Sequence, residues 1–345
     1  MTFLRNSWYI AAWSNEVTEQ PLGRRILDIP IVLYRALNDS AVALFGVCPH
    51  RFAPLRLGRL IGDAIECPYH GLRFDRYGKC VLNPHGRGAR PAALNIKRFP
   101  LVERHGACWI WMGDAERADE ASIPPLDFID DIGGRTVVRG HIHSNAYYEL
   151  LTDNIMDLGH VDFVHSQSLG SPSFATARAE VRVSRDGNTI RCDRWMPDDL
   201  QSPMLETVYE RRGRVDAWGD VTWYPAAVMK LSVGMTAVGA PRQEGRDIPS
   251  AHIMTPETKG STHYFWASAR DFKVGDGEYS RQFLEAFTNA FVNEDMRMVM
   301  AQQEEIGSAD LNALKPALLS TDAGPVQVRR ALTQLIAAER EAGPA

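Results

Sequence analysis

The chain has 345 residues, of which 45% are hydrophobic and 23% charged, and its formal net charge is −5. This composition is typical of a globular protein with room for about two domains. The small negative charge gives no reason to expect nucleic acid or an anionic membrane as a partner. The start lacks the apolar core of a signal peptide and no run reaches a membrane-spanning length, so we expect a cytoplasmic protein with no membrane partner.

The first third of the chain alternates short apolar runs with turn signals. Strands are predicted at IVLYR (31–35), AVALFGV (41–47) and ACWIWM (107–112). The polar residues Asn38-Asp39-Ser40 separate the first two runs, as in a hairpin turn. The sequence therefore predicts a small all-β domain over residues 1–115.

Two short motifs in this region each carry one cysteine and one histidine. Cys48-Pro-His50 is followed, after sixteen residues, by Cys67-Pro-Tyr-His70. Two thiolates and two imidazoles suit a Rieske [2Fe–2S] cluster, in which two Cys hold one iron and two His hold the other. Zinc is the alternative, because Cys2His2 sets also build structural zinc sites. Common zinc patterns put both Cys in one motif and both His in the other, so the mixed motifs favour the cluster.

A polar stretch containing Pro and Gly predicts a linker over residues 116–134. Beyond it, strands are predicted at TVVRGHIH (136–143), AEVRVSR (179–185), VTWY (221–224), VMKLSV (228–233) and THYFWAS (262–268). Helical patterns are present at 147–165, 279–306 and 330–345. Strands mixed with a few separate helices predict an α+β protein whose second domain, residues 135–345, has an antiparallel sheet flanked by helices.

The helical pattern at 147–165 contains a second candidate metal site. Asn154, Asp157 and His160 recur every three residues and share one helix face, while His165 is turned away on a regular helix. Both histidines reach one metal only if the helix ends or bulges between them, and Gly159 could loosen that turn. Two His and one carboxylate with open positions form the facial triad of non-haem Fe(II) oxygenases.

We expect the carboxylate on the helix at 279–306. An apolar stripe at helical spacing runs along it and consists of Phe283, Leu284, Phe287 and Phe291. Asp295 falls on this stripe, where a carboxylate is costly unless it is paired or bound to metal. Asp295 is therefore the first choice, and Glu294, off the stripe, is the second. Pairing of Asp295 with an arginine is the alternative.

Asp157 is not needed as a ligand when these three residues are available. We expect its carboxylate to contact a metal-bound histidine from outside, since such carboxylates commonly orient metal-bound imidazole. A solvated acid on the helix surface is the alternative. Asn154 is expected to lie near the iron without binding it.

At this point the chain resembles a known family, the oxygenase components of Rieske non-haem iron monooxygenases, in particular the vanillate and dicamba O-demethylase branch. The resemblance rests on CPHR, CPYHGL and DNIMDLGHVDFVH, and it runs over nearly the whole chain. RNSWYIAAWSNEV at the start and NPHGRGARPAALN at 83–95 support it. Leu72 stands where many ring-dihydroxylating relatives have Trp, which favours a monooxygenase.

The resemblance implies two ligand sets. The cluster is held by Cys48, His50, Cys67 and His70. The mononuclear Fe(II) is held by His160, His165 and Asp295. The resemblance also implies a head-to-tail homotrimer, in which Asp157 links His70 of one chain to an iron-site histidine of the next.

The activity implied is O2-dependent O-demethylation of a methoxylated aromatic acid, with release of formaldehyde. No G-x-G-x-x-G nucleotide motif follows a predicted strand, so we expect a separate reductase or ferredoxin to deliver electrons from NAD(P)H. Hydroxylation of another aromatic acid or of a sulfonate is the alternative. A pure Rieske electron carrier is a further one, but it needs only the first domain.

Two residues in the second half are candidates for substrate binding. Lys230 interrupts the apolar run AAVMKLSVGM, and His252 interrupts AHIM. A cation and an imidazole directed into one cavity would suit an aromatic carboxylate. A lysine facing water and a histidine packed in the core are the alternatives.

Overall fold

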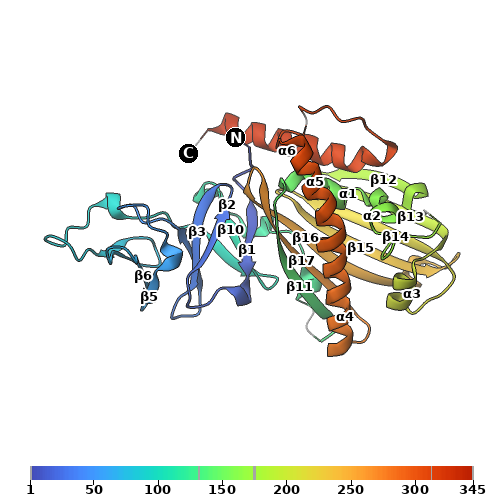
Figure 1. The fold of residues 1–345 in the computed structure, drawn as a ribbon, viewed down its shortest axis with the longest axis horizontal. Coiled ribbons are helices and arrows are strands. Elements are labelled where there is room, and N and C mark those ends of the chain that lie inside the picture. Colours follow the sequence, from blue (N-terminus) through green and yellow to red (C-terminus); the bar gives the residue numbers. More distant parts are fainter. Residues whose placement is uncertain (1, 131–132, 174–175, 312, 344–345) are drawn as a thin grey trace. The chain divides into compact units, whose positions relative to one another are not determined.

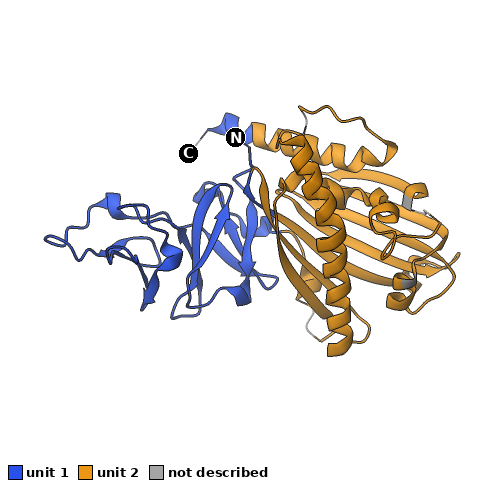
Figure 2. Ribbon diagram, in the orientation of Figure 1, with its two compact units in different colours: residues 1–123, 255–258, 338–345 blue, residues 124–254, 259–337 orange. Residues whose placement is uncertain are grey.

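The computed structural model describes residues 2–130, 133–173, 176–311 and 313–343. It forms two compact units (Figure 2). Unit 1 comprises Met1–Ile123, Thr255–Thr258 and Ala338–Ala345, and unit 2 comprises Pro124–Met254 and Lys259–Ala337. The break after Ile123 falls inside the predicted linker 116–134. The domain ranges 1–115 and 135–345 themselves remain predictions.

Two short segments of unit 1 come from the second half of the chain. Thr255 donates its hydroxyl to the carbonyl of Ile10 at 2.8 Å. The carboxylate of Glu339 accepts the backbone N–H of Arg5 at 2.8 Å. These long-range hydrogen bonds are the reason why a division by sequence position alone misses both segments.

Unit 1 consists of three small antiparallel sheets (Figure 1). The first sheet contains β1 (Trp8–Trp13), β10 (Ala107–Trp111) and β9 (Leu101–Arg104). The second contains β2 (Leu22–Ile26), β3 (Ile29–Arg35) and β4 (Ala41–Phe45). The third contains β5 (Arg59–Ile61), β6 (Ala64–Glu66), β7 (Arg73–Phe74) and β8 (Cys80–Leu82). The predicted all-β character of this region is confirmed.

The three strands predicted in this region are present. They correspond to β3, β4 and β10, and Asp39 lies at the turn between the first two with a φ of 64°. The strands of the third sheet are only two or three residues long, too short to give an alternating pattern. A buried cluster that includes Val32, Leu44 and Phe74 also contains both motif cysteines.

Unit 2 is built on one seven-stranded antiparallel sheet of order β11-β17-β16-β15-β14-β13-β12. Its strands are β11 (Thr136–Ser144), β12 (Glu180–Asp186), β13 (Thr189–Leu200), β14 (Arg214–Tyr224), β15 (Val228–Ala237), β16 (Arg246–Thr258) and β17 (Ser261–Arg270). The predicted α+β class is confirmed. Five of these strands contain the predicted runs, whereas β13 and β16 were not predicted.

The α-helices of the chain are α1 (Tyr148–Met156), α2 (Val161–Val164), α3 (Pro203–Tyr209), α4 (Gly277–Thr288), α5 (Met296–Ile306) and α6 (Ala323–Ala342). A π-helical segment, η10 (Asn289–Asp295), joins α4 to α5 into one long helical run across the sheet (Figure 1). The terminal helix begins at Ala323, earlier than the predicted residue 330. Within the described residues, no helix is long and apolar enough to cross a membrane.

Candidate metal centres and active site

The two Cys-His motifs fold into the same hydrogen-bonded loop. The N–H of Cys48 donates to the carbonyl of Ala53 at 2.9 Å, and the N–H of Cys67 donates to that of Leu72 at 2.7 Å. In both loops, the residue four positions after the cysteine donates back to the cysteine carbonyl, at 3.0 and 3.1 Å. The two motifs therefore have the same backbone hydrogen-bonding pattern, as expected of two loops that each supply half of the ligands of one site.

The residue four positions after the cysteine has a positive φ in each loop, 56° at Phe52 and 70° at Gly71. Glycine adopts this conformation without cost, whereas a side chain disfavours it. Phe52 is 80% exposed, so its ring gains no packing in compensation. The strain at Phe52 is the local cost of closing the first loop.

The loops bring the four predicted cluster ligands together. Cys48 and Cys67 are buried, and the rings of His50 and His70 lie 4.5 Å apart between centroids. Burial, with the neighbouring thiol of Cys67, raises the pKa of the Cys48 thiol to about 11. Thiolates in such a place need a positive partner, which the iron that both cysteines hold would supply. His50 is exposed and His70 is partly exposed, so the site has a buried sulfur end and an outward nitrogen end that fit a Rieske cluster.

The three predicted iron ligands meet in unit 2. Nε2 of His160 and Nε2 of His165 lie 3.3 and 3.2 Å from Oδ1 of Asp295. One ligand atom from each residue lies within 4.8 Å of the others. Asp295 is only 2% exposed. Two imidazoles and a carboxylate facing one point fit the ligand preference of non-haem Fe(II).

An interruption of the helical structure positions the two histidines. Helix α1 ends at Met156, and Asp157 is extended with φ −112° and ψ 97°. The short 3-10 helix η7 (Leu158–His160) and α2 follow, and His165 lies just after the end of α2. The helix does end between the two histidines, as predicted, because α2 stops at Val164, and a further change of direction comes earlier, at Asp157. The carbonyl of Asp157 contacts Nδ1 of His160 at 2.6 Å and so orients the ring.

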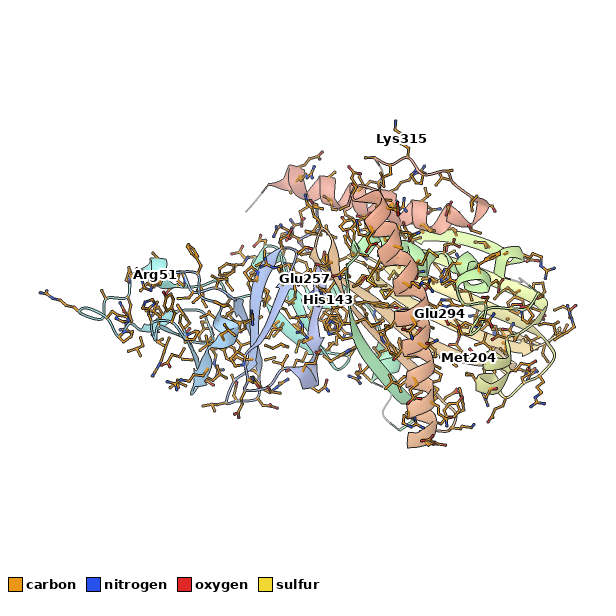
Figure 3. All side chains as sticks on the ribbon, viewed as in Figure 1. Arg51, His143, Met204, Glu257, Glu294 and Lys315 are labelled. Atoms are coloured by element: carbon orange, nitrogen blue, oxygen red, sulfur yellow. The ribbon has the colours of Figure 1, made fainter. Side chains whose placement is uncertain are left out.

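The π-helical segment η10 ends at Asp295 and directs two successive acids inward. Oε2 of Glu294 lies 2.5 Å from Nδ1 of His165, and Ser168 donates its hydroxyl to the same oxygen at 2.6 Å. Figure 3 labels Glu294 on this helical run. A carboxylate on the far nitrogen of a metal-bound histidine fixes its tautomer and orientation. The expectation that Glu294 is only a second choice of ligand missed this role.

The apolar stripe of the sequence prediction holds only in part. Phe283 and Phe291 are buried, but Leu284 is 36% exposed. Leu284 lies within the regular helix α4 and directly follows Phe283, so it is turned by about 100° from the row of Phe283, Phe287 and Phe291. The placement of Leu284 on the buried face is therefore wrong.

The iron-site residues shift one another's protonation. Burial opposes charge on Asp295, yet hydrogen bonds from His160 and His165 hold the pKa of Asp295 well below its usual range. Burial also disfavours protonation of His165, but its hydrogen bond to Asp295, together with Glu294, raises the pKa of His165 overall. Both shifts show that the acids of this site favour a positive charge beside them.

Asn154 and Asp157 both lie beside this site. Nδ2 of Asn154 donates to Oδ1 of Asp295 at 3.0 Å and lies 3.4 Å from Nε2 of His160, as expected for a residue near the iron. The carboxylate of Asp157 instead accepts the N–H of Gly159 at 2.9 Å and faces Arg194. Among the residues that the structure describes, the Asp157 carboxylate does not make the expected contact with a histidine of the iron site, because the Asp157 carbonyl occupies Nδ1 of His160.

A cavity of about 140 Å³ adjoins the iron site. His160, His165 and Asp295 form part of its wall, and strands β13 to β16 supply another part. Its size is close to that of the ~150 Å³ cavity known to hold benzene. The cavity therefore suits one substituted aromatic ring, placed next to the metal.

Lys230 is not among the residues that line this cavity, whereas its neighbour Leu231 is. Side chains alternate between the two faces of a strand, so adjacent residues of β15 point in opposite directions. The Lys230 ammonium lies 5.9 Å from the centroid of the Phe128 ring. The prediction that Lys230 points into the substrate cavity is wrong, and the parity of the strand is the reason.

His252 does line the cavity, as predicted. Its Nδ1 lies 2.6 Å from the hydroxyl of Tyr264, and its Nε2 lies 2.9 Å from that of Ser250. Burial lowers the pKa of His252 to about 4. The imidazole is therefore neutral near physiological pH, with both ring nitrogens hydrogen-bonded.

Sequence reasoning missed Arg194, a cavity-lining residue on β13 that is only 1% exposed. Its Nη2 donates to the carbonyl of Met156 at 2.8 Å and lies 3.3 Å from Oδ1 of Asp157. The segment TIRCDRWMPDDL reads as polar, so no pattern marked one of its arginines as buried. The alternation of Ile190, Cys192 and Arg194 on the inner face was the only available signal.

Two family models match the chain. The Rieske [2Fe–2S] domain matches residues 7–100, and the vanillate O-demethylase oxygenase C-terminal domain matches residues 144–338. Three similar relatives are oxygenase components. The chain is 41% identical to the dicamba O-demethylase oxygenase component of Stenotrophomonas maltophilia, with 97% of this chain and 98% of that protein covered. It is 40% identical to the chloroacetanilide N-alkylformylase oxygenase component of Rhizorhabdus wittichii, with 98% and 97% covered.

The third relative is the vanillate O-demethylase oxygenase subunit of a Pseudomonas species, at 33% identity with 99% and 98% covered. Among solved structures, dicamba monooxygenase bound to dicamba superimposes with a TM-score of 0.91 at 39% identity, over 99% of this chain and 100% of that one. The same enzyme with non-haem iron and dicamba gives 0.86 at 38% identity, over 99% of both chains. Both domains and their order thus have solved counterparts.

Proposed function

Because this chain belongs to the oxygenase components of Rieske non-haem iron monooxygenases, we propose that it removes the methyl group from a methoxylated aromatic compound. It is a Rieske-type O2-dependent enzyme with a [2Fe–2S] cluster and a mononuclear iron. Its electrons come from a separate component, and the substrate is aromatic. The observation that carries the proposal is the cavity for one ring beside the His160, His165 and Asp295 triad.

The ligand assignment is part of this proposal. Four residues of unit 1 are proposed to hold the cluster, namely Cys48, His50, Cys67 and His70. His160, His165 and Asp295 are proposed to hold the iron, with Glu294 and the Asp157 carbonyl orienting the two rings. When bound, the iron supplies O2 activation with electrons that the cluster delivers one at a time. The polypeptide contributes a largely apolar wall that would hold the methyl group at the metal.

The proposed reaction balances as follows. One oxygen atom of O2 is inserted into a C–H bond of the methyl group. The other oxygen atom takes up two electrons and two protons and is released as water. The hemiacetal so formed breaks its bond between the methyl carbon and the ether oxygen. Formaldehyde and a phenol are released. The two electrons come from NAD(P)H by way of the proposed reductase or ferredoxin.

The predicted carboxylate of the substrate had Lys230 as its partner. Because Lys230 lies outside the cavity, we propose an aromatic methyl ether as the substrate and do not specify a carboxylate on its ring. Oxidative N-dealkylation is a second candidate. It uses the same hydroxylation of a carbon next to a heteroatom, and the relative at 40% identity acts, by its name, on chloroacetanilides.

The quaternary structure is proposed from the resemblance alone. In a head-to-tail homotrimer, the cluster of one subunit would serve the iron of the next, with Asp157 between them. The Asp157 side chain is 24% exposed, which leaves it within reach of a neighbouring subunit.

The test is a substrate screen with a surrogate reductase and NADH. Methoxylated benzenes, phenols and benzoates, and N-alkyl anilides as the rival class, would be scored for formaldehyde or other aldehyde and for O2 consumed. We expect formaldehyde from an aryl methyl ether in step with O2 uptake, and none from a His160→Ala variant. Turnover of anilides with no turnover of any methyl ether would refute O-demethylation.

A further inference from the structure

One buried side chain on the cavity wall has a hydrogen-bond donor that the protein itself leaves unused. Arg194 lines the cavity and is only 1% exposed. Its Nη1 is buried and has no hydrogen-bond partner among the residues that the structure describes. A buried polar group without a partner is costly, so such a group in a binding cavity indicates a contact that a ligand completes.

The other terminal nitrogen of the same guanidinium is held in place. Nη2 donates to the carbonyl of Met156 at 2.8 Å and lies 3.3 Å from Oδ1 of Asp157. Because a guanidinium is planar and rigid, these two contacts also fix the direction of the N–H groups on Nη1. The donor is therefore oriented before a ligand arrives, which lowers the entropic cost of binding.

These contacts place the guanidinium on the wall that carries the first iron ligand. The residues on either side of the contacted pair, Ile155 and Leu158, both line the cavity. The carbonyl of Asp157 contacts Nδ1 of His160 at 2.6 Å, and His160 lines the cavity as well. Arg194 therefore belongs to the iron end of the cavity, where the ring of a methyl ether has to lie.

Other polar groups of the wall are satisfied within the protein. Both ring nitrogens of His252 are hydrogen-bonded. The hydroxyl of Tyr209 donates to a backbone carbonyl at 2.5 Å, and the amide of Gln201 donates to Asp199 at 3.1 Å. Across the described part of the chain, Arg194 is the only cavity-lining residue with a buried side-chain nitrogen or oxygen that lacks a partner.

The charges around this donor nearly balance once iron is bound. Fe(II) at the proposed site and the guanidinium match the carboxylates of Asp157, Glu294 and Asp295. Asp199 adds a negative charge to the wall, and its carboxylate accepts hydrogen bonds from uncharged donors. What a ligand has to supply at Nη1 is therefore an oxygen acceptor, whether anionic or neutral.

From these contacts we propose that Nη1 of Arg194 donates a hydrogen bond to a carbonyl-type oxygen on the substrate ring, as a carboxylate or a ketone carries. Arg194 is then a specificity-determining residue. The inference deepens the proposed function and rests on it, since the ring enters the cavity with its methyl group toward the iron. An apolar ring of the same shape is rejected, because it leaves the N–H without a partner.

The experiment measures binding apart from turnover, in wild-type protein with both metal sites loaded and no reductant. Calorimetry near pH 7, where a benzoate is ionised, would compare methoxyacetophenone, methoxybenzoate and isopropenylanisole, each as its ortho, meta and para isomers. The isopropenyl group has the shape of the acetyl group without its oxygen. We expect at least one ketone or acid isomer to bind about tenfold more tightly than the isopropenyl compound of the same pattern. If no isomer does, the proposal is overturned.

A matched pair of variants tests the role of Arg194 itself. Arg194→Met removes the donor and keeps an apolar stem, so it should reduce the preference for the oxygen acceptor about tenfold. A purely structural role would weaken the ketone and its isopropenyl match equally, and an unchanged preference would contradict the assignment. Arg191→Met, on the same strand with a side chain 52% exposed, should keep the wild-type preference. If Arg194→Met fails to fold, the wild-type series still decides.

The same ligands identify the acceptor and separate this inference from the proposed function. Tighter binding of the acid supports an anionic acceptor at Arg194, and tighter binding of the ketone supports a neutral one. A preferred ketone or acid that gives another oxidised product and no formaldehyde refutes O-demethylation and supports recognition by Arg194. Formaldehyde from the isopropenyl ether, with no preference for an oxygen acceptor, supports O-demethylation and refutes that recognition.

Discussion

At the scale of single residues, buried charges around the iron site decide how its ligands are held. Arg194 holds the Asp157 carboxylate and the end of α1, and Glu294 holds the His165 ring. Neither residue belongs to the triad. Both act through a neighbour, so their substitution should alter geometry and affinity while the triad stays complete.

The first prediction concerns Arg194→Met, which keeps an apolar stem of similar length. The lost charge-assisted hydrogen bonds should lower the free energy of unfolding by about 1.5–3 kcal/mol. With Asp157 released, we expect the reduced cluster to be reoxidised by O2 roughly tenfold more slowly in the presence of substrate. Stopped-flow absorbance of the cluster would measure this rate, and denaturant unfolding would measure the stability.

Arg191→Met is the matched control for this experiment, because Arg191 lies on the same strand with a side chain 52% exposed. We expect it to change neither quantity appreciably. An Arg194 variant that is destabilised but transfers electrons at the wild-type rate would limit Arg194 to a structural role.

The second prediction concerns Glu294→Gln. The amide cannot accept the Nδ1 proton of His165 as strongly as a carboxylate does, so the ring loses orientation and basicity. Iron affinity should fall about 10- to 100-fold. Iron titration of the chelated protein would measure it. Glu278→Gln, with a side chain 62% exposed near the start of α4, is the control and should bind iron as the wild type does.

At the scale of secondary-structure elements, two local irregularities build the two metal sites. The π-helical segment η10 places Glu294 and Asp295 beside His165. In the Cys-His loops, a positive φ at Phe52 and at Gly71 closes each turn. Such irregularities are found mostly at functional sites, where an α-helix or a standard turn would direct the side chains elsewhere.

The third prediction removes the π segment. Deleting the exposed residue Asn293 should allow an ordinary α-helix to replace the π segment, which changes the direction and the height of the side chains within it. Asp295 would turn away from the histidines. We expect loss of the mononuclear iron, while the visible absorption of the cluster remains. Asn293→Ala keeps the length and should retain both, and retention of the iron in the deletion variant would refute this role of η10.

The fourth prediction compares the two Cys-His loops. Gly71→Ala puts a Cβ at a φ of 70°, with the Pro84 side chain 3.4 Å from it. The cost should be about 1–2 kcal/mol, seen as a lower unfolding temperature and slower cluster insertion. Phe52→Gly should do the opposite, because it relieves a strained conformation in the other loop. If both variants behave alike, the equivalence of the two loops is wrong.

At the scale of the whole molecule, the question is whether cluster and iron act within one chain or between chains. The fifth prediction uses two inactive variants. Cys67→Ser removes the cluster, and His160→Ala removes the mononuclear iron. In the proposed homotrimer, of three times the 38.5 kDa chain mass, co-expressed variants should regain activity, because one subunit supplies the cluster and its neighbour the iron.

Light scattering would measure the mass, and formaldehyde release would measure the recovered activity. The two variants purified separately and mixed without exchange of subunits should stay inactive. No recovery in a proven mixed trimer would place electron transfer inside one chain.

The sequence by itself determined the chemistry of both sites and the class of the fold. Cys48 to His70 and His160 to His165 are short local motifs, so the residue types and spacings that a metal requires are visible in the covalent chain. The long apolar strands of unit 2 were visible for the same reason, since alternation over several residues is a local property. Strand β13 was not predicted because the buried face of this strand includes a charged residue, Arg194.

Only the tertiary structure decided which face each side chain occupies. Lys230 and Leu231 are adjacent, and the pairing of β15 with its neighbours determines which of them meets the cavity. Glu294 joined the site because the long helical run adopts a π turn where it packs over the iron ligands. Arg194 meets Asp157 across 37 residues of chain. Such choices depend on contacts between distant segments, whose free energy no local pattern contains.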